Sequence, residues 1–148
     1  MLVGIHHTAI STPDLDRLVA FYCEQLGFAV EFDFAWDESN LEFRRTHAAH
    51  ETRGRVVMLA NGASRLELFE YAKPAPRPVD GPRPNADHGV AHFCFEVKEI
   101  EAEYERLRAA GVPFLSEPVA QAYVKVCYGR DPDGNLFELL EFCGAPEA

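Results

Sequence analysis

The chain carries the stretch LELFEY at residues 66–71 and the similar stretch FELLEF at residues 137–142. In both, large apolar residues flank a carboxylate, Glu67 in the first and Glu138 in the second. Alternation with a period of two predicts a β-strand and places these carboxylates toward the interior, where an unpaired charge is costly. Their occurrence twice predicts an internal repeat, and this repeat decides the fold.

Three residues beyond each of these carboxylates stands a second one, Glu70 and Glu141. Odd spacing puts them on the opposite face of each strand, so we expect them to be solvated. A histidine opens each half of the chain, His7 in the first and His92 in the second. Each half therefore supplies one imidazole and one inward carboxylate.

The segments between histidine and carboxylate repeat in the same order. In the first half we expect a strand at Val3–Ile10, a helix at Leu15–Leu26 capped by Thr12 and ended by Gly27, and strands at Phe28–Phe34, Arg55–Ala60 and Arg65–Tyr71. In the second half we expect a strand at Val90–Val97, a helix at Glu99–Ala110, and strands at Val112–Leu115, Tyr123–Tyr128 and Leu136–Phe142. The polar stretch Asp37–Gly54 is predicted to be a long loop or lid.

Each half thus has the order βαβββ, which predicts an α+β fold. Residues 73–87 include a proline-rich run that fits neither a central strand nor a regular helix, and we interpret them as a linker. The prediction is one domain over residues 1–148, with modules 1–72 and 88–148. Neither module can cover its sheet alone, so the two pack together within one chain or across two chains.

Composition restricts the classes of partner. The 148 residues are 47% hydrophobic and carry a net charge of -10 with no compensating basic patch, which argues against nucleic-acid and anionic-membrane binding. No apolar run approaches the roughly 20 residues of a membrane span. Four scattered cysteines and an N-terminus unlike a signal peptide predict reduced thiols and a cytoplasmic protein.

The two histidines and two carboxylates suit one divalent metal ion. If the modules pack as pseudo-symmetric partners, equivalent strand faces turn toward a common cavity and His7, Glu67, His92 and Glu138 point into it together. Imidazole nitrogens and carboxylate oxygens fit Ni, Zn, Co, Mn or Fe. Four such ligands on an octahedral ion leave two positions for substrate oxygens, and Glu67 or Glu138 is then the candidate base.

These motifs make the chain resemble the vicinal oxygen chelate superfamily, which includes glyoxalase I, methylmalonyl-CoA epimerase, extradiol dioxygenases and bleomycin resistance proteins. The similar segments extend over nearly the whole chain and are Ile5–Ile10, Asp14–Gly27, Gly89–His92 and Asp131–Leu139. The resemblance implies two βαβββ modules in tandem forming an open, cup-shaped mixed sheet (glyoxalase-like). It also implies metal ligands at His7, Glu67, His92 and Glu138, and a homodimer acting on a small molecule.

Glu67 favours one reaction class within that superfamily. Extradiol dioxygenases do not use a ligating carboxylate at this position, whereas glyoxalase I enzymes do, so the set favours an isomerase or lyase acting through an enediolate. Two departures separate the chain from glyoxalase I. Ser11 stands where that family has an Arg and Tyr71 where it has an Asn, and both family residues help to hold glutathione.

Three functions from different classes therefore stay open. The first is a metal-dependent isomerase or lyase on a small oxygenated substrate, with Phe69, Tyr71, Tyr123 and Lys125 as substrate contacts. The second is an Fe(II) extradiol-type dioxygenase. The third is a protein that sequesters a drug or natural product, with Phe34, Trp36, Phe69 and Tyr71 lining an aromatic groove.

Overall fold

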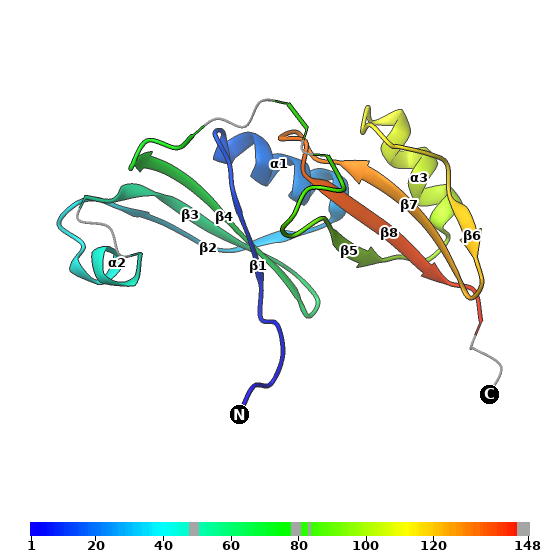
Figure 1. Cartoon of the computed structure of the whole chain (residues 1–148), viewed down its shortest axis with the longest axis horizontal. Helices are drawn as coiled ribbons and strands as arrows, with labels where there is room; N and C mark the ends of the chain where they lie inside the picture. Colours follow the sequence, from blue (N-terminus) through cyan, green and yellow to red (C-terminus); the bar gives the residue numbers. More distant parts are fainter. Residues whose placement is uncertain (48–50, 78–80, 83, 145–148) are drawn as a thin grey trace. The chain divides into compact units, whose positions relative to one another are not determined.

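The computed structural model describes residues 1–47, 51–77, 81–82 and 84–144, and its contacts divide the chain into two units, Met1–Pro78 and Val79–Ala148 (Figure 1). The division falls inside the proline-rich segment predicted to be a linker. Residues 78–80 and 83 of that segment lie outside the described residues. Each unit contains one four-stranded mixed sheet, and the element order βαβββ occurs twice, which confirms the predicted α+β fold of two tandem modules.

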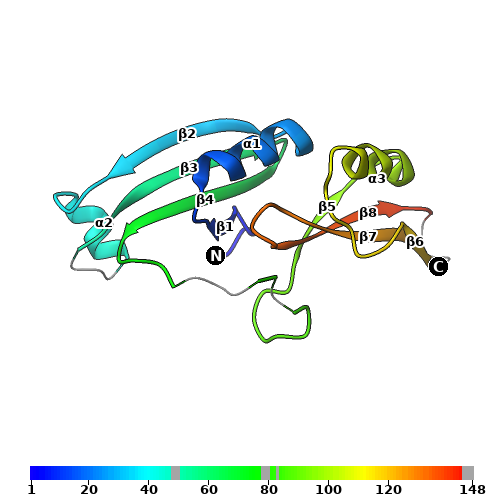
Figure 2. The same cartoon turned by 90° about the horizontal axis from the view of Figure 1, so that it is seen from above.

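Unit 1 forms a sheet with the strand order β1-β4-β3-β2, in which β1 is parallel to β4 and the other pairs are antiparallel. Its elements are β1 Thr8–Ser11, α1 Leu15–Leu26, β2 Ala29–Trp36, α2 Leu41–Thr46, β3 Arg53–Asn61 and β4 Ser64–Lys73. Helix α1 lies along one face of this sheet (Figure 2). Leu18 and Tyr22 of the helix and Leu59 and Leu68 of the strands are fully buried, which gives this face its apolar core.

Unit 2 repeats the arrangement with the strand order β5-β8-β7-β6, again with the first pair parallel. Its elements are β5 Phe93–Glu96, α3 Ile100–Ala109, β6 Val119–Gln121, β7 Val124–Arg130 and β8 Leu136–Phe142. Ile100 and Leu107 of the helix and Cys127, Phe137 and Leu139 of the strands are fully buried. Leu68 and Leu139, each one residue after the inward carboxylate, occupy equivalent positions in the two cores.

Two predicted features of α1 have different outcomes. Gly27 ends the helix in the left-handed region with φ 69°, and its N–H bonds the carbonyl of Tyr22, as predicted. The N-cap, however, is Asp14, whose carboxylate accepts the N–H of Arg17, and the prediction of Thr12 is wrong. Thr12 instead donates its N–H to the carbonyl of Phe69 in the sheet. The helix is therefore capped two residues later than predicted.

The largest difference from the predicted loops is in residues 37–54. This stretch contains α2, capped by Asn40, and the first residues of β3. In unit 2 the third element is β6, and Val112–Leu115 is not a strand. Pro113 lacks an N–H, and only an isolated bridge joins Phe114 to Gly129. Both first strands are also shorter than predicted and begin after the histidine that opens each half.

Glu70 and Glu141 are not simply solvated, contrary to the prediction. Glu70 accepts the N–H of Leu15 at the start of α1, at 3.2 Å. Glu141 accepts the N–H groups of Glu99 and Ile100 at the start of α3, at 2.8 and 3.2 Å. In each unit the last strand therefore holds the N-terminus of the helix that covers it.

Among the described residues, no helix is long and apolar enough to cross a membrane.

Candidate functional site

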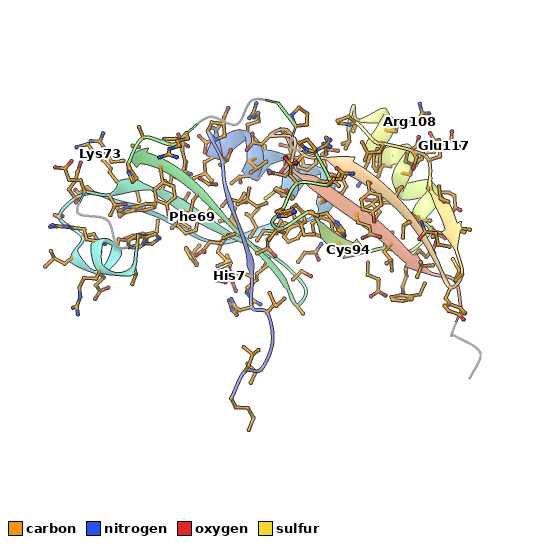
Figure 3. All side chains as sticks on the ribbon, in the orientation of Figure 1. His7, Phe69, Lys73, Cys94, Arg108 and Glu117 are labelled. Atoms are coloured by element: carbon orange, nitrogen blue, oxygen red, sulfur yellow. The ribbon has the colours of Figure 1, made fainter. Side chains whose placement is uncertain are left out.

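In unit 1 the structure brings His7 and Glu67 together. His7 Nε2 lies 3.1 Å from Glu67 Oε2, and the two side chains are 35% and 19% exposed. The second ring nitrogen, His7 Nδ1, lies 2.9 Å from Nδ1 of His6, so the ring is held from both sides. The parallel register Ala9↔Glu67 places the residues after His7 beside the carboxylate, which explains how the pair forms. Figure 3 marks His7, just before β1, and Phe69 on β4 of the same unit.

Unit 2 forms the same pair with His92 and Glu138. His92 Nε2 lies 3.0 Å from Glu138 Oε2, and the side chains are 35% and 11% exposed. In the parallel pairing of β5 with β8, Cys94 lies beside Glu138, just as Ala9 lies beside Glu67 in unit 1. The two units thus hold an imidazole nitrogen and a carboxylate oxygen at nearly the same separation and exposure.

These separations fit a pair of metal ligands. Donors at about 2.1 Å from an octahedral ion lie about 3.0 Å apart when they occupy adjacent positions. Imidazole with carboxylate is also a donor set that divalent transition metals accept. Within the described part of the chain, no cluster of three or more His, Cys, Asp or Glu side chains able to hold a metal forms. Each unit brings together two of the four residues predicted to be ligands.

Two neighbours of Glu138 escaped the sequence reasoning. Tyr128 stands directly across the β7–β8 ladder from Glu138, and its ring lies edge-on to His92 with centroids 5.3 Å apart. Burial and the Glu138 carboxylate raise the pKa of Tyr128, so its hydroxyl is a donor at neutral pH. Burial and the same carboxylate raise the pKa of Cys94 to about 12, so this thiol is also protonated. Strand alternation could have placed Tyr128 and Cys94 on the face of Glu138 only if the strand registers had been known.

Phe69 and Tyr71 continue the Glu67 face along β4. Their rings stack with centroids 5.6 Å apart, and the ring of Trp36 lies edge-on to both. Helix α2 adds Phe43, stacked on Trp36 at 4.5 Å, and His47 follows at its C-cap. Burial and then Glu67 raise the pKa of Tyr71, so it too is a neutral phenol. The predicted aromatic residues therefore form one cluster within unit 1.

Tyr123 and Lys125 lie elsewhere in unit 2. The register Lys125↔Glu141 puts Lys125 on the helix-covered face of the sheet, opposite the face that carries Glu138. There its ammonium group pairs with Glu101 of α3 at 2.6 Å. Tyr123 is half-exposed in the turn just before that strand. Their role as substrate contacts stays a prediction, and the position of Lys125 favours a structural role.

Comparison with known proteins gives concordant results. Residues 4–139 match the model of the Glyoxalase/Bleomycin resistance protein/Dioxygenase superfamily. A 2-epi-5-epi-valiolone epimerase from an Actinomyces species is 36% identical, over 97% of this chain and 82% of that protein. A lactoylglutathione lyase from Schizosaccharomyces pombe is 25% identical, over 92% of this chain and 46% of that protein. The crystal structure of a glyoxalase family protein from Bacillus cereus has the same fold, with a TM-score of 0.83 at 24% identity over 97% of both chains.

Proposed function

The chain belongs to the glyoxalase, bleomycin resistance protein and dioxygenase superfamily, and we propose that it is a divalent-metal-dependent isomerase that epimerises a carbon next to a carbonyl group. The observation that carries the proposal is the pair of matched His–Glu contacts, one in each unit. The similarity to an epimerase supports the reaction class. The pairs would together hold one ion through His7, Glu67, His92 and Glu138.

The bound ion would polarise the substrate carbonyl and offset the negative charge of the enediolate. The protein's own carboxylates move the proton. Epimerisation requires removal of a proton from one face of a carbon and its return to the other, so it needs two acid–base groups. Glu67 and Glu138 come from equivalent places in two repeated units, and we assign the removal to Glu67 and the return to Glu138.

The surroundings of the two carboxylates support this division of roles. Glu138 is the more buried and has the phenol of Tyr128 directly across the ladder. Across from Glu67 stands Met58, whose thioether donates no hydrogen bond. Glu67 is therefore the better placed to accept a proton from carbon, while Glu138 is held with donors around it.

The test offers the protein the ketone named for its relative, 2-epi-5-epi-valiolone, in D2O with one divalent metal at a time. We expect deuterium from the solvent to replace the proton at the epimerised carbon. Proton NMR measures this exchange. Glu67→Gln is expected to lower the exchange rate by about 10²–10⁴-fold, since a lost general base typically has that effect. Exchange at the wild-type rate in both Glu67→Gln and Glu138→Gln would contradict the assignment.

A second candidate is a binding protein that sequesters a natural product without catalysis. The cluster of Trp36, Phe43, Phe69 and Tyr71 favours it, because stacked rings offer a wide apolar surface to a ligand. Metal analysis separates the candidates: a protein that holds no divalent ion and exchanges no proton is a binder. Oxygen uptake with catechol after anaerobic loading with Fe(II) would instead identify the dioxygenase alternative.

A further inference from the structure

Unit 1 contains a pocket of about 310 Å³ at the far end of the Glu67 face. Its size is in the range of small-molecule sites. The residues that line it come from β1, the end of α2, the start of β3 and the end of β4. They are Ser11, His47, Thr52, Tyr71, Pro74, Ala75 and Pro76.

The chemistry of this lining favours an uncharged occupant. The described residues that form it include no Lys, Arg, Asp or Glu, and its polar groups are three hydroxyls and one imidazole. A charged group bound there would find no side chain of opposite charge among these residues to pair with. The nearby ammonium group of Lys73 is engaged with Glu38 at 3.0 Å.

One side of the pocket is aromatic and firmly supported. The rings of His47 and Tyr71 lie 6.2 Å apart at a steep angle, and His47 stacks on Phe43 at 5.0 Å. Behind them the indole N–H of Trp36 donates to the hydroxyl of buried Thr52 at 3.0 Å. A fixed corner of two rings fits the flat apolar face of another ring, and the hydroxyls can bond its edge.

The position along the sheet decides which part of a substrate could bind there. Tyr71 is four residues beyond Glu67 on the same face of β4, and Ser11 is four residues beyond His7. Four strand residues span about 13 Å. The pocket therefore lies too far along the strand for the carbon whose proton Glu67 removes. It is placed to receive a second part of a substrate larger than the single-ring ketone named above.

We propose that the Ser11–Tyr71 pocket binds an uncharged ring of the substrate, carried about 13 Å from the reacting carbon, and selects neutral-ring substrates over anionic ones. The inference rests on the proposed function only in placing the reacting carbon at Glu67. Aromatic and sugar rings share the required chemistry, since both present a flat apolar face and a neutral edge.

The test uses Trp36 as a reporter, because the chain has one tryptophan and its indole N–H contacts the pocket residue Thr52. Benzyl alcohol, methyl β-glucoside and benzoate are titrated while the indole resonance is followed by NMR. Benzoate is matched to benzyl alcohol except for its charge. We expect a saturable shift with at least one neutral ring, which identifies the ring type, and a much weaker response to benzoate. No response to either neutral ring, or equal affinity for benzoate, would overturn the proposal.

Substitutions test whether the residues of this pocket bind the ring. Tyr71→Ala and His47→Ala are expected to weaken binding of the neutral ring about tenfold, as expected for loss of one stacking partner. Tyr71→Phe keeps the ring and is expected to bind like the wild type. Phe142→Ala removes an exposed aromatic ring of unit 2 and is the matched control. Wild-type affinity in both Tyr71→Ala and His47→Ala would refute the assignment of the pocket.

The same titration with EDTA separates this inference from the proposed function. The pocket uses no metal ligand, so ring binding is expected to persist in EDTA and in His92→Ala. If the protein binds the ring but neither metal nor deuterium exchange is found, the isomerase proposal fails and the pocket stands. If metal binding and deuterium exchange are found without ring binding, the pocket assignment fails and the isomerase proposal stands.

Discussion

At the scale of single residues, Tyr128 makes the two carboxylates different. Tyr128 faces Glu138 across β7 and β8, whereas Met58 faces Glu67 across β3 and β4. The separations within the two His–Glu pairs are nearly equal, at 3.0 and 3.1 Å. A tyrosine placed across from one carboxylate and not from its counterpart is expected to fix the orientation of that carboxylate.

Tyr128→Phe tests this role. We expect an unchanged metal content and an exchange rate lowered about 10- to 100-fold, the usual effect of removing a hydrogen-bond partner from a metal ligand. Metal analysis and deuterium exchange measure the two quantities on one sample. Tyr104→Phe is the control, because Tyr104 is a buried tyrosine of α3 in the same unit. An exchange rate equal to that of the wild type would leave Tyr128 with a packing role only.

At the scale of elements, each unit uses a strand carboxylate to hold its helix. α1 also has its own N-cap Asp14, which accepts the N–H of Arg17, in addition to the strand carboxylate of Glu70, which accepts the N–H of Leu15. In α3 the N-cap residue Glu99 makes no side-chain capping bond, so Glu141 serves this helix from β8. The two helices therefore depend on their strand carboxylates to different degrees.

This difference predicts unequal stability losses. Glu141→Ala is expected to lower the free energy of unfolding by about 1 kcal/mol, the typical cost of a lost cap, and Glu70→Ala by less. Urea denaturation measures both. Glu24→Ala, at an exposed position of α1, is the control and is expected to be nearly neutral. A larger loss in Glu70→Ala than in Glu141→Ala would contradict this account of the caps.

At the scale of the whole molecule, the proposal requires both units to share one ion. His7→Ala and His92→Ala should then each abolish metal binding, although the two residues belong to different units. The metal content of the wild type is expected to be one ion per chain. A ligand present at about 100 times its dissociation constant stabilises the folded state by about 2.7 kcal/mol, which would raise Tm by several degrees.

Calorimetry with and without added metal tests this sharing. We expect the rise in Tm in the wild type and no rise in either variant. The control is Lys125→Ala, which removes a charged side chain from the helix-covered face of unit 2. Two ions per wild-type chain, with one lost in each histidine variant, would show instead that each His–Glu pair binds its own metal.

The amino-acid sequence was enough to recognise the repeat, the order βαβββ, the positions of α1 and α3 and the two His–Glu pairs, but not α2. These follow from local periodicity: alternation along a strand assigns faces, and steps of three and four residues assign a helix. Glu67 and Glu138 could be recognised because a carboxylate among large apolar residues is costly wherever the strand lies.

Only the tertiary structure decided which side chains meet across strands. Tyr128 reaches Glu138, Lys125 turns away from it, and Glu141 caps α3 because of the β7–β8 register and the packing of the helix. The pocket at Tyr71 likewise depends on α2 and on the segment after β4, which local periodicity did not reveal. The physical reason is that period-two alternation assigns a residue to a face, whereas its neighbours on that face come from chain pairing distant in sequence.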